Sequence, residues 1–134
     1  MKSLRMLPLL LLLAGSTATV QAQDKKDSKG IYTYVDRMPE FTSDVNTYLA
    51  SNIKYPEKAR KENVQGRAVI KFVVDEQGKV QNAMVEKATN PVLDAEALRV
   101  VRSMPAWRPG ALKGKPVKVY YRIPIMFTLD NNKG

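Results

Sequence analysis

The stretch from Gly66 to Lys87 most constrains how this chain can fold. Every second residue of its first half is apolar: Ala68, Ile70, Phe72 and Val74. A period of two is typical of a β-strand that lays one face on a core. A turn sequence containing Gly78 follows, and a second extended run then carries three further apolar residues, Val80, Ala83 and Val85. This pattern predicts a β-hairpin, and the change of apolar parity between Val80 and Ala83 indicates a bulge in its second strand.

An isolated hairpin is only marginally stable in water, so the preceding residues must help to cover it. Thr42 or Ser43 can cap a first helix, whose apolar residues share one face: Val45, Tyr48, Leu49 and Ile53. Pro56 suits the first position of a second, short helix that would run to about Asn63 with Ala59 facing inward. Residues 31–35 are β-branched and aromatic, which fits a short extra strand.

The residues after the hairpin predict one further helix and one long strand. Asn90 and Pro91 fit an N-cap and a first-turn proline, and an apolar stripe follows them: Leu93, Ala97, Val100, Val101 and Met104. The turn-rich segment 107–116 is predicted to be a connection. From Val117 to Leu129 every second residue is apolar, which predicts a strand. Pro124 cannot donate to a ladder, so we expect one side of this strand to be open.

These elements predict an α+β fold: a small three-stranded antiparallel sheet with two to three helices packed on one face. The chain has 134 residues, of which 44% are hydrophobic and 26% are charged, as in a globular protein with one modest domain. We expect a signal peptide at 1–22, a flexible leader at 23–37 and the domain at 38–130. The first part of that leader, Gln23 to Gly30, has no apolar residue with which to join a core.

The N-terminal residues predict export. Lys2 and Arg5 precede an apolar block, and Val20 and Ala22 stand three positions and one position before a cut after Ala22. The apolar run Met6 to Val20 would make about 22 Å of helix, shorter than the roughly 30 Å hydrocarbon core of a bilayer. A cleaved signal peptide and a periplasmic location are therefore expected, and an uncleaved anchor in the inner membrane is the alternative.

The composition excludes most kinds of enzyme. The chain has no His and no Cys, which excludes imidazole triads, thiol catalysis and the usual zinc sites. Asp94 and Glu96 would lie on different faces of a helix, and Asp75 and Glu76 fall in a turn, so neither pair forms an acid-base site. We therefore predict no enzymatic activity, no cofactor and no metal site.

The chain is basic, with 22 Lys and Arg against 13 Asp and Glu and a net charge of +9. Cleavage after Ala22 would remove Lys2 and Arg5 and leave +7. In an exported protein this charge favours anionic partners over nucleic acid, and a solvated basic surface with no partner explains it equally well.

Several motifs together resemble the C-terminal domain of the energy-transducing TonB proteins. They are Tyr55-Pro56-x-x-Ala59, Gly66, the hairpin with Phe72 and Gly78-x-Val80, Leu93-Asp94-x-Glu96-Ala97, Met104-Pro105-x-Trp107-x-Pro109-Gly110 and Pro124-x-x-Phe127. The resemblance covers about Met38 to Leu129, and Met38-Pro39-Glu40-Phe41 is similar to forms seen in Bacteroidetes-type bacteria. It implies a periplasmic domain that grips the N-terminal box peptide of a TonB-dependent outer-membrane transporter and transmits force from a proton-driven motor.

The sequence also departs from this family's pattern. Full transducers carry an N-terminal membrane anchor and a long proline-rich spacer, and we expect neither here, since residues 23–41 span at most about 65 Å. Well-known members have glutamine three residues before the Tyr-Pro pair, where this chain has Asn52. Two alternatives therefore stay open. One is a periplasmic structural or regulatory protein with another partner, and the other is a short anchored transducer that also contacts an inner-membrane ExbB/ExbD-type motor.

The last predicted strand supplies the candidate binding site. An open edge accepts an extended peptide by strand addition, and Lys118 and Arg122 would favour an acidic one. We expect partner contacts at Tyr120, Tyr121, Arg122, Ile123, Pro124 and Ile125, and secondary contacts at Asn52, Tyr55, Pro56 and Arg60. Tyr55 and Pro56 also fit a purely structural role between two helices, and Trp107 is expected in the core.

We predict that the mature protein begins at Gln23, because the short apolar block and the small residues Val20 and Ala22 fit signal-peptide cleavage. N-terminal sequencing of protein released by osmotic shock tests this. An intact Met1 in the inner-membrane fraction would contradict it and favour the anchored alternative.

Overall fold

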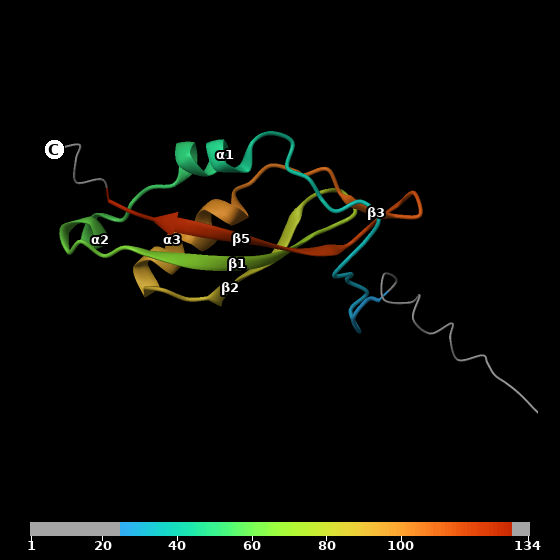
Figure 1. Ribbon diagram of the computed structural model, residues 1–134, viewed down its shortest axis with the longest axis horizontal. Coiled ribbons are helices and arrows are strands. Elements are labelled where there is room, and N and C mark those ends of the chain that lie inside the picture. Colours follow the sequence, from blue (N-terminus) through green and yellow to red (C-terminus); the bar gives the residue numbers. More distant parts are fainter. Residues whose placement is uncertain (1–24, 130–134) are drawn as a thin grey trace, which may run out of the picture.

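The computed structural model describes residues 25–129 and has a three-stranded antiparallel sheet with helices packed against it (Figure 1). The predicted α+β architecture is confirmed. The predicted signal peptide lies outside the described residues. In chain order the elements are α1 (Val45–Asn52), α2 (Glu57–Lys61), β1 (Gly66–Val74), β2 (Val80–Lys87), α3 (Pro91–Arg102), β3 (Gly110–Leu112), β4 (Lys115–Val117) and β5 (Val119–Phe127).

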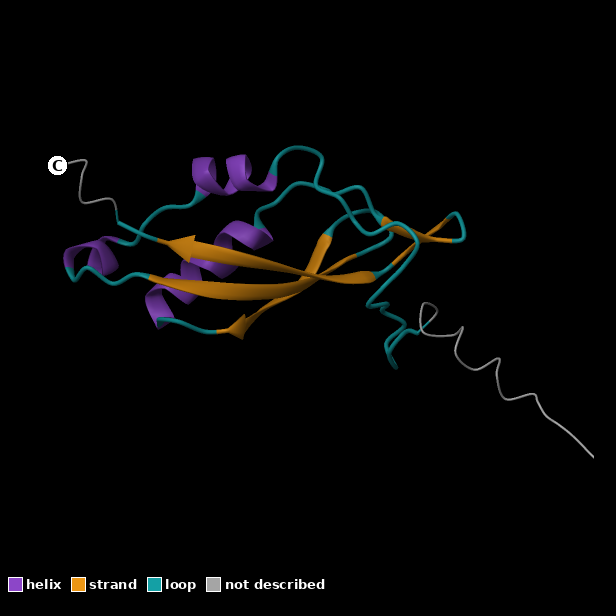
Figure 2. Ribbon diagram, in the orientation of Figure 1, coloured by secondary structure: helices purple, strands orange, loops and turns teal. Residues whose placement is uncertain are grey.

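The sheet has the order β2-β1-β5, and β1 lies in its centre (Figure 2). β1 pairs with β5 along its whole length, from Gly66 opposite Phe127 to Val74 opposite Val119. The β1–β2 pairing contains two register shifts, one of which inserts an extra residue of β2 around Asn82, whose φ is 53°. The bulge predicted between Val80 and Ala83 is therefore confirmed.

One core joins the sheet to the helices. α1 and α2 contribute Leu49 and Ala59 to it, and all five residues of the predicted α3 stripe are buried. Trp107 is 3% exposed, as expected of a core residue, and its ring contacts those of Phe41, Phe72 and Tyr121 with centroids 4.9–5.5 Å apart. These aromatic contacts fix the segment after α3 against the sheet.

The turn between β1 and β2 is held by the buried side chain of Asp75. Its carboxylate accepts hydrogen bonds from the backbone N–H groups of Gln77 (2.9 Å) and Lys79 (2.8 Å) and from the Gln81 amide (3.0 Å). Burial alone would raise the pKa of Asp75, but these hydrogen bonds together outweigh it and lower the pKa. Gly78 completes the turn at φ +86°, where a Cβ would lie 1.9 Å from the Trp107 carbonyl oxygen.

Several predictions about element boundaries are wrong. The last strand ends at Phe127 and not at Leu129, and α2 ends at Lys61 and not near Asn63. The N-cap of α1 is Asp44, whose carboxylate accepts from the Asn46 N–H, and not Thr42 or Ser43. The last strand begins at Val119, because Val117 belongs to β4 and pairs with Gly110. The segment predicted to be a plain connection therefore contains a two-stranded hairpin, β3–β4. Three-residue strands are too short to show a periodic pattern.

Residues 26–37, which we call the strap, lie against the sheet. The sequence places them in a flexible leader and suggests an extra strand at 31–35. The structure instead has a single parallel bridge, between Tyr32 and Val119, and buries Ile31 and Val35. Further along, Arg37 and Ala111 exchange two backbone hydrogen bonds, of 3.1 and 2.8 Å. The domain boundary at residue 38 stays a prediction.

We predict that Phe72→Ala lowers the free energy of unfolding by about 3 to 5 kcal/mol, because Phe72 is 1% exposed and packs against Trp107 and Tyr121. Denaturant unfolding measures the change. Met84→Ala is the control, since Met84 is 53% exposed on β2 and should change stability little. Equal stability of the two variants would contradict the assignment of the sheet faces.

We also predict that the stabilising effect of Asp75 depends on pH. Its pKa is lowered in the folded state, so its contribution is complete above the ordinary value of 3.8 and is lost as the pH falls through the folded pKa. Asp75→Asn should cost about 1 to 3 kcal/mol near neutral pH, and the difference from wild type should narrow in acid. Denaturant unfolding across this range measures it, with the exposed Glu76→Gln as control. A difference that stays constant with pH would refute the prediction.

Candidate functional site

β5 is the edge strand at which the predicted site lies. One side of it bonds to β1, and the other side is free of any strand in the described residues. The N–H of Tyr120 points to this open side, where it donates to the Tyr32 carbonyl oxygen at 3.0 Å. Because backbone groups alternate between the two sides of a strand, those of Arg122, Pro124 and Met126 also face the open side.

The open edge offers few free N–H donors. Tyr120 already uses its N–H, and Pro124 has none. Within residues 25–129, the outward N–H groups of Arg122 and Met126 have no backbone partner. These two residues are four positions apart, which is about 14 Å along a strand. A strand paired here must therefore present acceptors at that separation.

A mostly apolar groove of about 290 Å³ runs between α1 and this edge. It is lined by Leu49, Ala50 and Ile53 of α1, with Asn46, and by Pro124, Ile125 and Met126 of β5. The Met126 side chain is 62% exposed. Since side chains alternate across a strand, an extended segment paired with β5 would point every second side chain toward α1. The groove therefore favours apolar side chains at those positions.

The face of the sheet opposite the helices carries the polar residues of β5. The Lys71 ammonium lies 4.2 Å from the centre of the Tyr120 ring, and Arg122 Nε bonds Glu86 Oε1 at 2.6 Å. Arg122 lowers the pKa of the Glu86 carboxyl through this hydrogen bond. Arg122 was predicted to favour an acidic partner, and the structure gives it an acidic partner within the sheet. Such exposed pairs stabilise little, so this one leaves Arg122 able to exchange partners.

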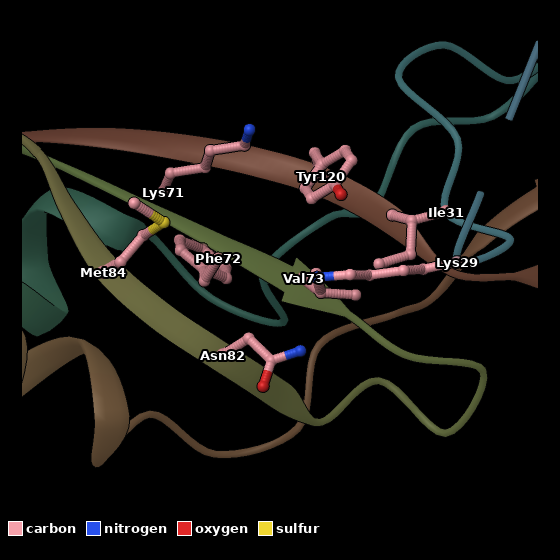
Figure 3. Close-up of a pocket in the computed structure, with 8 residues that line it drawn as sticks. All are labelled: Lys29, Ile31, Lys71, Phe72, Val73, Asn82, Met84 and Tyr120. Atoms are coloured by element: carbon pink, nitrogen blue, oxygen red, sulfur yellow. The ribbon is translucent and has the colours of Figure 1, made fainter. Parts of the chain in front are cut away.

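A shallow pocket of about 350 Å³ lies on the same face (Figure 3). Lys71, Val73 and Tyr120 form part of its wall, and Lys29 and Ile31 of the strap close one end. The strap thus contacts both the edge and the outer face of the sheet.

Tyr55 and Arg60, predicted as secondary contacts, lie at the other end of β5. The Tyr55 ring meets Phe127 edge-on at 5.8 Å, and its hydroxyl donates to the Val64 carbonyl oxygen. Burial raises the pKa of Tyr55, opposed by the charge of Arg60, whose guanidinium lies 5.4 Å from the ring centre. Pro56 is half-buried and is the N-cap of α2, which begins at Glu57, so the prediction that Pro56 is the first helical residue is wrong by one position. Tyr55 and Pro56 therefore have a packing role here, while Arg60 is exposed.

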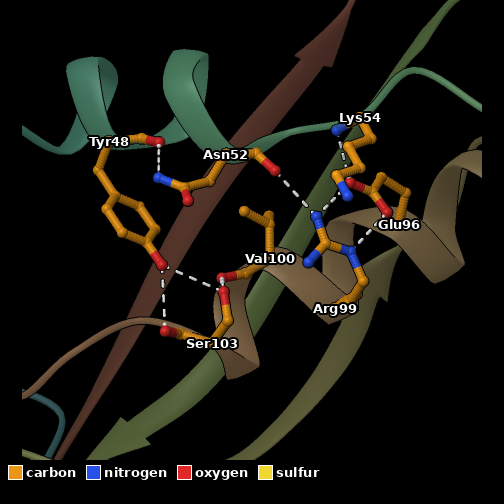
Figure 4. A network of polar contacts seen from close by, with 7 residues as sticks. All are labelled: Tyr48, Asn52, Lys54, Glu96, Arg99, Val100 and Ser103. Carbon is orange, nitrogen blue, oxygen red and sulfur yellow. Dashed lines mark hydrogen bonds and ion pairs between the residues drawn. The ribbon is translucent and has the colours of Figure 1, made fainter.

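Asn52, the fourth predicted secondary contact, belongs to a polar network that joins α1 to α3 (Figure 4). Its side-chain amide donates to the backbone carbonyl oxygen of Tyr48 at 2.8 Å, and its backbone carbonyl oxygen accepts from the Arg99 guanidinium at 2.9 Å. Glu96 accepts from Arg99 and from the Lys54 N–H, both at 2.7 Å, and its pKa is lowered chiefly by the Arg99 bond. We call these contacts the clasp. The clasp ties the C-terminal end of α1 to α3.

The structure brings the six predicted strand residues together on β5 but gives them different parts. Tyr121, Ile123 and Ile125 turn their side chains to the core and their backbone groups to β1. Only their neighbours in β5 therefore present backbone groups to the open edge. The sequence analysis did not assign Leu49, Ala50 or Met126 to the site. The apolar face predicted for α1 was the available signal, but nothing in the sequence shows which part of that face borders the edge.

Within residues 25–129 no helix is long and apolar enough to cross a bilayer. The same part of the chain has no group of three or more metal-ligating side chains that could hold an ion.

A sequence profile of the family described as Gram-negative bacterial TonB protein C-terminal matches residues 51–129. A curated relative, Protein TonB of Pseudomonas putida, is 33% identical in an alignment 97 residues long that covers 69% of this chain and 39% of that protein. The chain thus spans less than half the length of this relative.

Solved TonB C-terminal domains share the fold. A longer NMR fragment from Helicobacter pylori has a TM-score of 0.52 at 22% identity, covering 89% of this chain and 99% of that one. A shorter fragment from the same organism has a TM-score of 0.50 at 24% identity, covering 65% of this chain and 91% of that one. The Pseudomonas aeruginosa domain has a TM-score of 0.51 at 18% identity, covering 72% of this chain and 89% of that one.

Proposed function

Because this chain belongs to the TonB C-terminal domain family, we propose that it is a periplasmic protein-binding domain acting in energy-coupled transport across the outer membrane. Its partner is the N-terminal box peptide of a TonB-dependent outer-membrane transporter, bound by strand addition to β5. The observation that carries this proposal is the open edge of β5 beside an apolar groove. The domain works by binding alone, without catalysis, cofactor or metal.

The backbone of the edge supplies affinity for an extended segment. Arg122 and Met126 offer N–H donors, and the Pro124 carbonyl between them remains an acceptor. Backbone hydrogen bonds make few demands on the sequence of the bound segment, so one domain can serve several transporters. Pro124 also makes the edge a poorer template for a second copy of the chain, because it removes the donor in the middle.

The side chains around the edge supply selectivity. The α1 groove takes apolar side chains from one face of the bound segment. On the opposite face Arg122 is held only by an exposed ion pair with Glu86, and an acidic side chain of the partner can replace Glu86. The favoured segment therefore alternates apolar and polar or acidic residues. The exposed residues Asn52 and Arg60 extend the contact beyond the end of β5, and Tyr55 and Pro56 support that end by packing.

We predict that peptides from transporter N-termini shift NMR signals of Arg122 to Met126 and of the α1 residues that line the groove. Met126→Pro should weaken binding by about 3- to 10-fold, because it removes one of the two free donors. The substitution should be tolerated, because the Met126 N–H faces away from β1 and Pro124 already occupies the equivalent position two residues earlier.

Met126→Ala is the matched control, since it removes the same exposed side chain and keeps the N–H. Signal shifts confined to α2 and α3, or none at millimolar peptide, would refute strand addition at β5. Equal affinity of the Pro and Ala variants would show that the Met126 donor is not used.

A further inference from the structure

The strap occupies the start of the edge on which the proposed function relies. The Tyr32 N–H donates to the Lys118 carbonyl oxygen at 2.9 Å, and the Tyr32 carbonyl accepts from the Tyr120 N–H at 3.0 Å. Tyr32 thus forms a parallel bridge with Val119, as a one-residue added strand would. A partner strand cannot use the same groups while Tyr32 holds them.

Several contacts hold the strap in this place. Ile31 is 5% exposed and lies with Val73 at one pocket, where Val73 is 3% exposed although it faces away from the helices (Figure 3). The Asp27 carboxylate accepts from the Tyr120 hydroxyl and, at 2.9 Å, from the Ile31 N–H. At the other end of the strap, Asp36 accepts from the Lys113 N–H at 2.8 Å. The strap is therefore fixed on both sides of Tyr32.

The strap divides the edge into two parts. β5 has nine residues, or about 30 Å of strand. Tyr32 covers its first two residues, and the free donors begin at Arg122. The accessible part from Arg122 to Phe127 is about 20 Å long and has room for about six residues of a partner.

We propose that the strap sets the register and the length of the bound segment, with Tyr32 as the positioning residue. This inference rests on the proposed function. Because Tyr32 occupies the backbone groups of Lys118 and Tyr120, a partner can pair with β5 only from Arg122 onward. A partner that extends past Arg122 toward the start of β5 gains no further backbone bonds. The domain thus takes a short extended segment that ends where the strap begins.

The test compares wild type with the double variant Asp27→Ala/Ile31→Asp. The first change removes the acceptor for the Tyr120 hydroxyl. The second places a charge at a buried site, which expels the strap. Ile31 is not part of the core cluster around Phe72, so the domain should stay folded. Tyr34→Ala is the control, because Tyr34 is on the strap and 68% exposed.

The first measurement, NMR amide hydrogen exchange, needs no peptide. The Tyr120 N–H should exchange at least about tenfold faster in the double variant than in wild type or Tyr34→Ala, because it loses its Tyr32 acceptor. The Ile123 N–H, which faces β1, should stay protected and report that the sheet is intact. Unchanged exchange at Tyr120 would overturn the inference.

The second measurement uses a six-residue box peptide and two longer forms, extended by three residues at either end, because the direction of pairing is open. Wild type should bind all three with equal affinity. The double variant should bind one longer form about tenfold more tightly and the short form unchanged, since two further backbone bonds become available. A longer form that binds wild type more tightly than the short form, or no gain in the double variant, would overturn the inference.

Absence of binding by every peptide to both proteins would instead refute the proposed function. It would equally overturn the role of the strap in setting a partner's register, whereas a positive Tyr120 exchange result would still show that the strap closes this part of the edge.

Discussion

The unbroken pairing of β1 with β5 is the interaction on which the rest of this structure depends. All nine residues of each strand take part, without a register shift. The β1–β2 pairing, by contrast, contains two shifts. Bulges twist a strand and make its outer edge a poor template for pairing. The sheet therefore has two edges but only one regular one, and the regular edge carries the candidate site.

The second determinant of the site is the position of α1. Only one of its residues, Leu49, is buried, and its C-terminal end is tied to α3 by the clasp around Arg99 and Glu96. The Arg99 side chain is 48% exposed, so the clasp is partly screened by salt. α1 is thus less firmly fixed than α3, which buries four residues. A groove wall of this kind can adjust to different side chains in the bound segment.

The long periodic segments could be predicted from the sequence, and the short or non-local features could not. β1, α3 and β5 have nine, twelve and nine residues, long enough to show a repeating apolar pattern, and the bulge in β2 shows as a change in the apolar parity of its strand. β3, β4 and the Tyr32 bridge are too short to show one. The Arg122–Glu86 pair and the clasp join residues 36 and 47 positions apart, which no local pattern reveals. The open edge was predicted from Pro124 alone, and its division by the strap needed the structure.

The alternation of backbone groups along β5 also has a mechanical consequence. Hydrogen bonds between paired strands run across the strands, at right angles in an antiparallel pair and slanted in a parallel one. A force directed along a segment paired with β5 would therefore load its bonds in shear, all at the same time. A force at right angles to the strand would open them one after another, starting from an end. The same few bonds would resist a lengthwise pull far better than a sideways one, so the direction of pull would decide how long a segment paired with β5 stays bound.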